Sequence, residues 1–139
     1  MRLDKVLLQT SVYDTLVETQ NALNDKQMYK APYDPEHGDT NISPLTASDI
    51  IEALIDGSQL SDVSALTICS TLEFYDDEGN DEDDTLSKYF VINDYFYNIL
   101  KNTKTRCNKY IYKKRVITYS DIITFLIVKF AHKLRKGTI

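Results

Sequence analysis

The sequence predicts a single small, mainly α-helical domain spanning residues 1–139, with four or five helices and at most a short β element. A chain of 139 residues suits one domain, and an apolar fraction of 42% is enough to build a core. Most apolar residues recur at three- and four-residue steps, the period of an amphipathic helix. The four glycines are few for the many tight turns of a β-barrel or sandwich.

The first predicted helix covers residues 3–24. Its apolar residues follow the helical period: Leu3, Val6, Leu7, Tyr13, Leu16, Val17 and Leu23. Residues 25–45 contain the three prolines of the chain, a density that excludes a regular helix. We expect a long loop there, which is either an arm that wraps the domain or a binding loop.

The second predicted helix has the clearest boundaries. Thr46 suits the N-cap position, and Asp49 falls in the first turn, where the helix dipole favours an acid. Its apolar stripe is unbroken and consists of Ala47, Ile50, Ile51, Leu54 and Ile55. Gly57 then suits the position just after the helix.

Residues 58–75 carry a less decisive pattern. We expect a helix that begins at Ser58 or Ser61, although alternating apolar residues over 66–74 fit a strand equally well. Residues 76–84 read DDEGNDEDD, and like charges at this density repel one another and resist regular packing. We therefore expect an acidic loop there.

Two further helices are predicted in the second half of the chain. The first covers residues 85–102, with a strand over 88–92 as the competing interpretation. A short basic strand or loop follows at 109–117. The last helix covers 120–136, with an acid in its first turn, bases in its last turn and Gly137 as its end, an order that suits the helix dipole.

The charge of the chain is divided between its two parts. Residues 1–100 hold 5 of the 16 Lys and Arg and 20 of the 21 Asp and Glu, a net charge of −15, whereas residues 101–139 have a net charge of +10. Two interpretations follow. Either the basic part pairs with the acidic part of the same chain, or one of them is an interaction surface for another macromolecule.

The acidic loop is one candidate partner-binding site, through Asp81, Glu82, Asp83 and Asp84. An EF-hand needs an acid at loop position 1 and glycine at position 6, but Gly79 at position 6 would place Phe74 at position 1. We therefore expect no metal site. The loop is either simply solvated, or it mimics phosphates toward a basic partner, or it docks on the basic part of its own chain.

The basic stretch is the other candidate partner-binding site. Its residues are Lys109, Tyr110, Tyr112, Lys113, Lys114 and Arg115. Cations with interleaved tyrosines suit nucleic acid, because cations contact phosphates and aromatic rings stack on bases. No helix-turn-helix, zinc-finger, RRM or KH motif accompanies them, so a solvated or self-paired basic surface is the alternative.

The sequence contains no motif of an enzyme active site, and we expect no enzymatic activity, cofactor or metal. The two histidines, His37 and His132, are not spaced as metal ligands. Arg106 and Lys109 flank Cys107 and could lower its pKa, whereas Cys69 resembles a core residue. The N-terminus lacks a signal peptide, and the longest apolar run is too short to span a bilayer. We expect a soluble, intracellular protein in a reducing compartment.

These observations favour a non-enzymatic interaction or assembly protein with opposed acidic and basic poles. In a homo-oligomer, the acidic pole of one copy would meet the basic pole of the next. Frequent Asn, Tyr, Ile and Asp with few Gly are typical of AT-rich genomes, including many phages and viruses, so a viral or phage structural connector is one form of this hypothesis. The alternative is a nucleic-acid-binding protein that uses residues 101–136, and an enzyme of unrecognised type is the third class.

Overall fold

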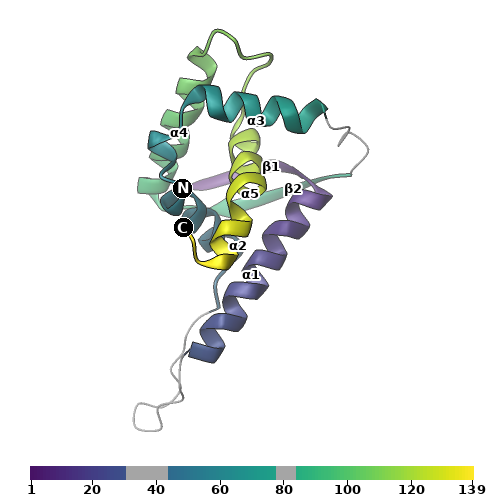
Figure 1. The fold of residues 1–139 in the computed structure, drawn as a ribbon, viewed down its shortest axis with the longest axis vertical. Helices are drawn as coiled ribbons and strands as arrows, with labels where there is room; N and C mark the ends of the chain where they lie inside the picture. The colour runs from purple at the N-terminus through teal and green to yellow at the C-terminus, as the bar shows by residue number, and fades with distance from the viewer. Residues whose placement is uncertain (31–43, 78–83) are drawn as a thin grey trace.

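The structure, a computed structural model of the chain, describes residues 1–30, 44–77 and 84–139. Within them, five α-helices pack with a two-stranded antiparallel sheet (Figure 1). The elements are β1 Arg2–Gln9, α1 Thr10–Lys30, α2 Ala47–Gly57, the short 3-10 helix η1 Leu60–Asp62, α3 Ala65–Asp77, β2 Thr85–Val91, α4 Asp94–Lys109 and α5 Tyr119–Lys136. The predicted mainly helical single domain is confirmed.

Helix α5 is the centre of the fold. It packs against the other four helices and against β1, and it runs through the middle of the molecule (Figure 1). Its fully or nearly fully buried residues are Ile122, Ile123, Phe125, Leu126, Ile127 and Ala131. Thr118 and Asp121 form a reciprocal capping box, and Gly137 ends the helix in the left-handed region at φ 73°. The predicted last helix is confirmed.

The N-terminal segment differs from its prediction, because residues 2–9 form strand β1 and the helix begins only at Thr10. Leu3 and Val6 are three residues apart, so a regular strand would turn them to opposite faces. A register shift between them, with Lys5 at φ 57°, lets both side chains face the core. This bulge produces a three-residue spacing that resembles a helix in the sequence.

The predicted helix over residues 85–102 is also wrong in its first half. Strand β2 pairs antiparallel with β1, from Arg2 opposite Val91 to Gln9 opposite Thr85. The competing strand over 88–92 was therefore the better interpretation. Helix α4 begins only after Asn93, whose side chain accepts a hydrogen bond from the Tyr95 N–H.

Helices α2 and α3 confirm the remaining predictions, with changes at their ends. Thr46 and Asp49 form a capping box in α2, as expected. Gly57 is the last helical residue rather than the residue after the helix, and a Cβ there would lie 3.3 Å from the Ile139 side chain, which would have to shift slightly. Helix α3 starts later than expected, and Ser64 accepts the hydrogen bond from the Thr67 N–H at its first turn.

Two predicted loops fall largely outside the described residues. Residues 31–43 of the proline-rich loop are among those not described, and residues 25–30 belong to α1. Residues 78–83 of the acidic loop, with Asp81, Glu82 and Asp83, are also not described, whereas residues 76–77 belong to α3. In the part of the chain that is described, no helix has the length and apolarity needed to cross a bilayer.

Candidate functional site

The predicted basic site consists of Lys109, the last residue of α4, and a loop between α4 and α5, residues 110–117, which we call the apex loop. It rises beyond α3 at one end of the molecule (Figure 1). It contains turns and bends but no strand, so the loop alternative for residues 109–117 is correct. At the base of the loop Ile117 is buried in the core, with a relative exposure of 3%.

One asparagine closes the base of the apex loop. The Asn108 side chain donates from Nδ2 to the Ile117 carbonyl at 2.8 Å and accepts from the Ile117 N–H at Oδ1, also at 2.8 Å. An amide side chain can do this because it carries a donor and an acceptor side by side. The two ends of the loop are therefore held together as by a pair of backbone hydrogen bonds.

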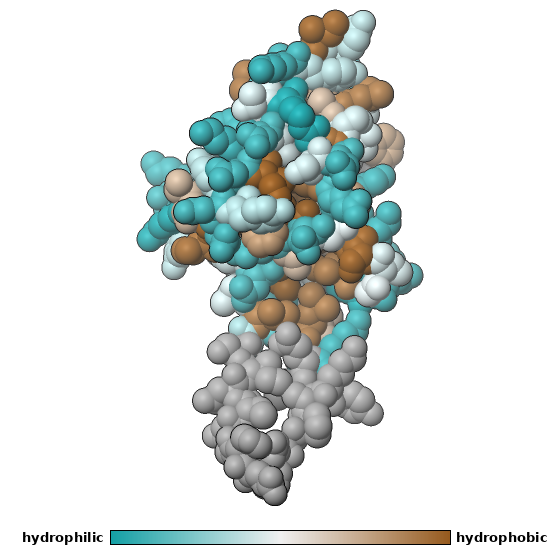
Figure 2. Space-filling model, turned by 90° about the vertical axis from the view of Figure 1, so that its left-hand side faces the viewer, coloured by the Kyte–Doolittle hydropathy of each residue, from teal (hydrophilic) through white to brown (hydrophobic). Residues whose placement is uncertain are grey.

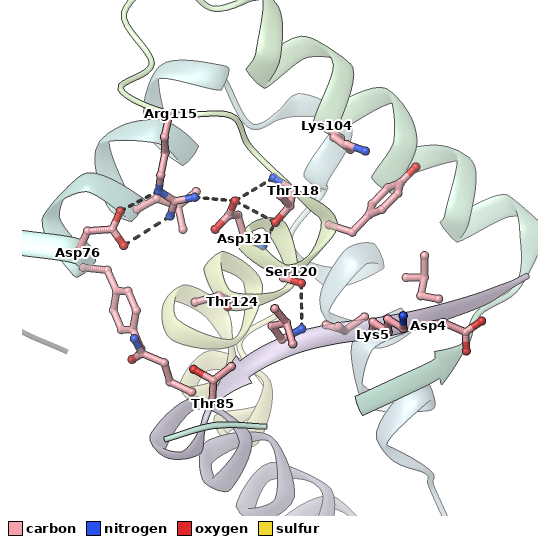
Figure 3. A pocket seen from close by; sticks show the side chains of 17 residues that line it. Asp4, Lys5, Asp76, Thr85, Lys104, Arg115, Thr118, Ser120, Asp121 and Thr124 are labelled. Atoms are coloured by element: carbon pink, nitrogen blue, oxygen red, sulfur yellow. Dashed lines mark hydrogen bonds and ion pairs between the residues drawn. The ribbon is translucent and has the colours of Figure 1, made fainter. Parts of the chain in front are cut away.

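Ion pairs tie the apex loop to the helices beside it. Lys114 Nζ lies 2.6 Å from Glu73 Oε1 of α3. The Arg115 guanidinium lies between two carboxylates, 3.1 Å from Asp76 and 2.7 Å from Asp121, as Figure 3 shows. For Lys114 and Arg115, the structure shows the pairing of basic and acidic parts within one chain. Exposed pairs of this kind contribute about 0–1 kcal/mol each, but here they position the loop.

Most of the predicted basic site comes together on one pocket. A pocket of about 200 Å³ between the loop and α3 is lined by Tyr110, Tyr112, Lys113, Lys114 and Arg115 from the loop and by α3 residues including Cys69 and Glu73. Lys109 instead lines a separate, shallow basin of about 360 Å³ beside α4. Asp84 joins neither, and its carbonyl accepts hydrogen bonds from the Thr10 N–H and hydroxyl, both at 2.8 Å.

The most exposed part of the apex loop is apolar, which the sequence analysis missed. Ile111, Tyr112 and Val116 have relative exposures of 79%, 73% and 69%. Hydrophobic residues gather at this upper end of the molecule in Figure 2. Among the described residues, Lys109 and Lys113 beside them form no ion pair. The only sign of this surface in the sequence is that apolar residues occur in a lysine-rich stretch without the spacing of a helix or a strand.

A larger cleft of about 570 Å³ lies below the loop, between β1 and the start of α5 (Figure 3). Several of its polar groups are already engaged. Ser120 Oγ accepts from the Leu7 N–H at 2.9 Å, and Asp121 accepts from the Thr118 N–H and hydroxyl. Burial, and then the hydrogen bond with Tyr97, raises the pKa of Tyr119 to about 12. Tyr119 therefore supplies no acid or base near neutral pH.

The pKa of each cysteine is raised, so neither thiol is activated as a nucleophile. Burial raises the pKa of Cys107 from its ordinary 9.0 to about 11, which outweighs the opposite effect of Arg106. The lowering of this pKa that the neighbouring cations could have caused therefore does not occur. The Arg106 guanidinium instead donates to the Leu60 and Val63 carbonyls at 3.1 and 2.8 Å. Cys69, expected in the core, is half-buried, and the described residues contain no cluster of three metal-ligating side chains.

Comparison with known proteins gives no functional lead, because no family model, curated protein or solved structure matches this chain. The function therefore has to be inferred from the apex loop and its surroundings.

Proposed function

We propose that this chain is a non-enzymatic interaction or assembly protein that docks a protein partner through its apex loop. The exposure of Ile111, Tyr112 and Val116 on a loop with a fixed base carries this proposal. Apolar and aromatic anchors dominate binding energy at interfaces, and a loop already held in one conformation loses little entropy on binding. A structural component of a virus or phage particle is one form of this function.

The charge around the anchors restricts the chemistry of the partner. Lys109 and Lys113 carry positive charge beside the apolar tip, and within the described part of the chain no carboxylate pairs with either. A partner surface with an apolar centre and an acidic border would complement them. Such complementarity sets specificity and the rate of association more than affinity.

Site-specific photo-crosslinking tests the proposal. A photoreactive residue at Ile111 should give protein adducts in the cells that make this protein, whereas the same residue at the exposed Asp14 of α1 should not. The adducts should weaken when Tyr112 and Val116 are changed to Ser. An absence of protein adducts at Ile111, or equal adducts at both positions, would contradict docking through this loop.

A second candidate, nucleic-acid binding, is favoured by the shallow basin on α4. This basin, of about 360 Å³, is lined by Lys101, Lys104, Thr105, Asn108, Lys109 and Tyr119, with no carboxylate among these residues. Lysines without acidic neighbours suit phosphates, and Tyr112 offers an exposed ring for stacking.

A salt titration with a single-stranded oligonucleotide tests this candidate. Changing Lys101, Lys104 and Lys109 to Gln should weaken binding equally for all sequences and flatten its salt dependence, since phosphate contacts carry no base information. Changing Tyr112 to Ala should cost about 1–3 kcal/mol if a base stacks there. Gln at Lys129 and Lys136 of α5 is the matched control. No binding at low salt would remove this candidate.

A further inference from the structure

A second exposed apolar surface lies where the N-terminus meets the end of β2. Met1, Tyr89, Val91 and Tyr95 have relative exposures of 54%, 60%, 58% and 66%. Tyr89 and Val91 lie on one face of β2, Arg2 pairs with Val91 across the sheet, and the Arg2 guanidinium, paired with Asp4 at 2.6 Å, lies 4.2 Å from the centre of the Tyr89 ring. The Met1 amine lies 3.3 Å from Asp94, the residue before Tyr95. We call these four residues the terminal patch.

Carboxylates border the terminal patch along α2. The Val91 N–H donates to Ser48 Oγ at 3.1 Å, and the Asn93 N–H donates to Glu52 at 3.2 Å, so α2 lies directly beside the patch. Its charged residues are Asp49, Glu52 and Asp56, spaced along one helix face, and α2 has no Lys or Arg. Asp94, whose side chain is 84% exposed, adds a further carboxylate, which pairs at 3.3 Å with the Met1 amine of its own chain.

The terminal patch and the apex loop lie at opposite ends of α4. Asp94 begins this helix and Lys109 ends it, and Figure 1 shows the N-terminus near the lower end and the apex loop above the upper end. A helix of 16 residues is roughly 24 Å long at about 1.5 Å per residue. This rigid spacer prevents the apex loop from reaching the terminal patch of its own chain.

We propose that the partner of the apex loop is a second copy of this chain, which receives the loop on its terminal patch. The occupant is inferred from complementarity: an apolar tip flanked by Lys109 and Lys113 faces an apolar patch bordered by carboxylates. The inference rests on the proposed function and names its partner. The contact is heterologous, so each added copy leaves one apex loop and one terminal patch free, and the copies form an open chain or close into a ring.

Sedimentation equilibrium of the purified full chain tests the inference. The mean mass should rise with protein concentration at low salt and fall when salt is added. An apex variant, I111S/Y112S, and a patch variant, V91T/Y95S, should each associate at least about tenfold more weakly. Val128→Ser, at an exposed apolar residue of α5 outside both surfaces, should behave as wild type. Circular dichroism checks that each variant is folded.

Mixing the two variants identifies the geometry. The patch variant keeps an intact loop and the apex variant keeps an intact patch, so their mixture should form a one-to-one dimer and nothing larger. Charge reversal gives an independent readout: K109E/K113E and D56K/D94K should each reduce association, and the chain that combines all four changes should recover it.

The inference is overturned if the wild type stays monomeric at low salt, if the mixture forms no dimer, or if the apex variant alone associates as tightly as the wild type. A monomeric wild type with adducts between Ile111 and a different protein would overturn the second copy as partner and leave the proposed function standing. An absence of any protein adduct at Ile111 would remove the proposed function itself.

Discussion

Two asparagine side chains each pair with both backbone groups of a residue outside their own helix. Asn108 pairs with both backbone groups of Ile117, and Asn24 of α1 pairs in the same way with Leu45, accepting from its N–H at 2.7 Å and donating to its carbonyl at 3.1 Å. A buried backbone group without a partner is costly, so each asparagine stabilises the contact between its helix and the residue with which it pairs.

Asn108→Ala should loosen the apex loop while leaving the core intact. The Ile117 N–H and carbonyl would lose their partners, so we expect a loss of about 1–3 kcal/mol in the free energy of unfolding. Hydrogen exchange at the Ile117 amide should accelerate more than exchange in α5. Asn102→Ala, at an exposed position of the same helix, is the control and should change neither quantity.

The buried thiol of Cys107 predicts a loss of stability at alkaline pH. Because burial raises its pKa, the folded state holds this proton more tightly than the unfolded state does. The contribution of this bound proton to the free energy of unfolding is therefore complete below about pH 9 and is lost as the pH rises through about 11. Over this range the free energy of unfolding should fall by up to about 1.4 kcal/mol per pH unit. Denaturation curves of Cys107→Ala should show a shallower decline over this range. Parallel curves for both proteins would contradict the assignment.

At the scale of elements, burial within α5 decides which residues the core depends on. Leu126 is fully buried, whereas Phe130 is only half-buried and its ring meets Phe125 edge-on at 5.8 Å between centroids. Both are apolar residues four positions apart on the same helix, so the sequence period alone does not distinguish them. The structure ranks them, because only a fully enclosed side chain leaves a closed cavity when it is removed.

Leu126→Ala should lower the free energy of unfolding by about 2–5 kcal/mol, the usual cost of truncating a fully enclosed aliphatic side chain. Phe130→Ala should cost clearly less, and Val128→Ala, on the exposed side of α5, should change stability little. Urea denaturation of the three variants gives this order. A Leu126 variant as stable as the Val128 variant would place α5 outside the core.

The bulge in β1 makes a separate prediction. Lys5 adopts φ 57°, a region that costs most L-residues energy and costs glycine little. Lys5→Gly should therefore keep stability within about 1 kcal/mol of wild type, because relief of strain offsets the entropy lost by glycine. Lys5→Val should destabilise the chain, since β-branched residues tolerate this region poorly. Equal thermal stability of the two variants would show that the bulge is absent.

At the scale of the whole molecule, only some residues of the basic part form ion pairs with the acidic part of the same chain. Lys114 and Arg115 pair with Glu73 and Asp76, and Arg135 lies 3.7 Å from Glu18 of α1. These contacts tie the basic part to the acidic part. Other cations stay at the surface beside the apex loop, where they are available to a partner.

The lysines of the apex region should therefore separate into two classes. K109Q/K113Q should leave stability within about 0.5 kcal/mol of wild type and still weaken association, since neither lysine pairs within the described chain. Lys114→Gln and Arg115→Gln should lower stability slightly, by no more than about 1 kcal/mol each. Thermal melts and sizing of the same variants check this. Equal behaviour of both classes would show that the ion pairs do not position the loop.

The sequence by itself determined the features that depend on neighbours within a few residues. The Thr46 N-cap, the acids in the first turns of α2 and α5 and the Gly137 end were predicted because their interactions lie within one or two helical turns, whereas the Thr118 cap of α5 was not. The fold class followed from the same periodicity. The six cations and tyrosines of the basic stretch were also identified from local composition, although not their separation between a pocket and a basin.

Only the tertiary structure decided the features that depend on residues far apart in the chain. Strands β1 and β2 form because Leu3 lies opposite Phe90, and a bulge at Lys5 hides the period of the strand. Ile111 is exposed because no other element of the described structure packs over it. Whether an apolar residue is buried or exposed depends on residues far away in the chain, so the exposed apolar surfaces can be recognised only in the folded structure.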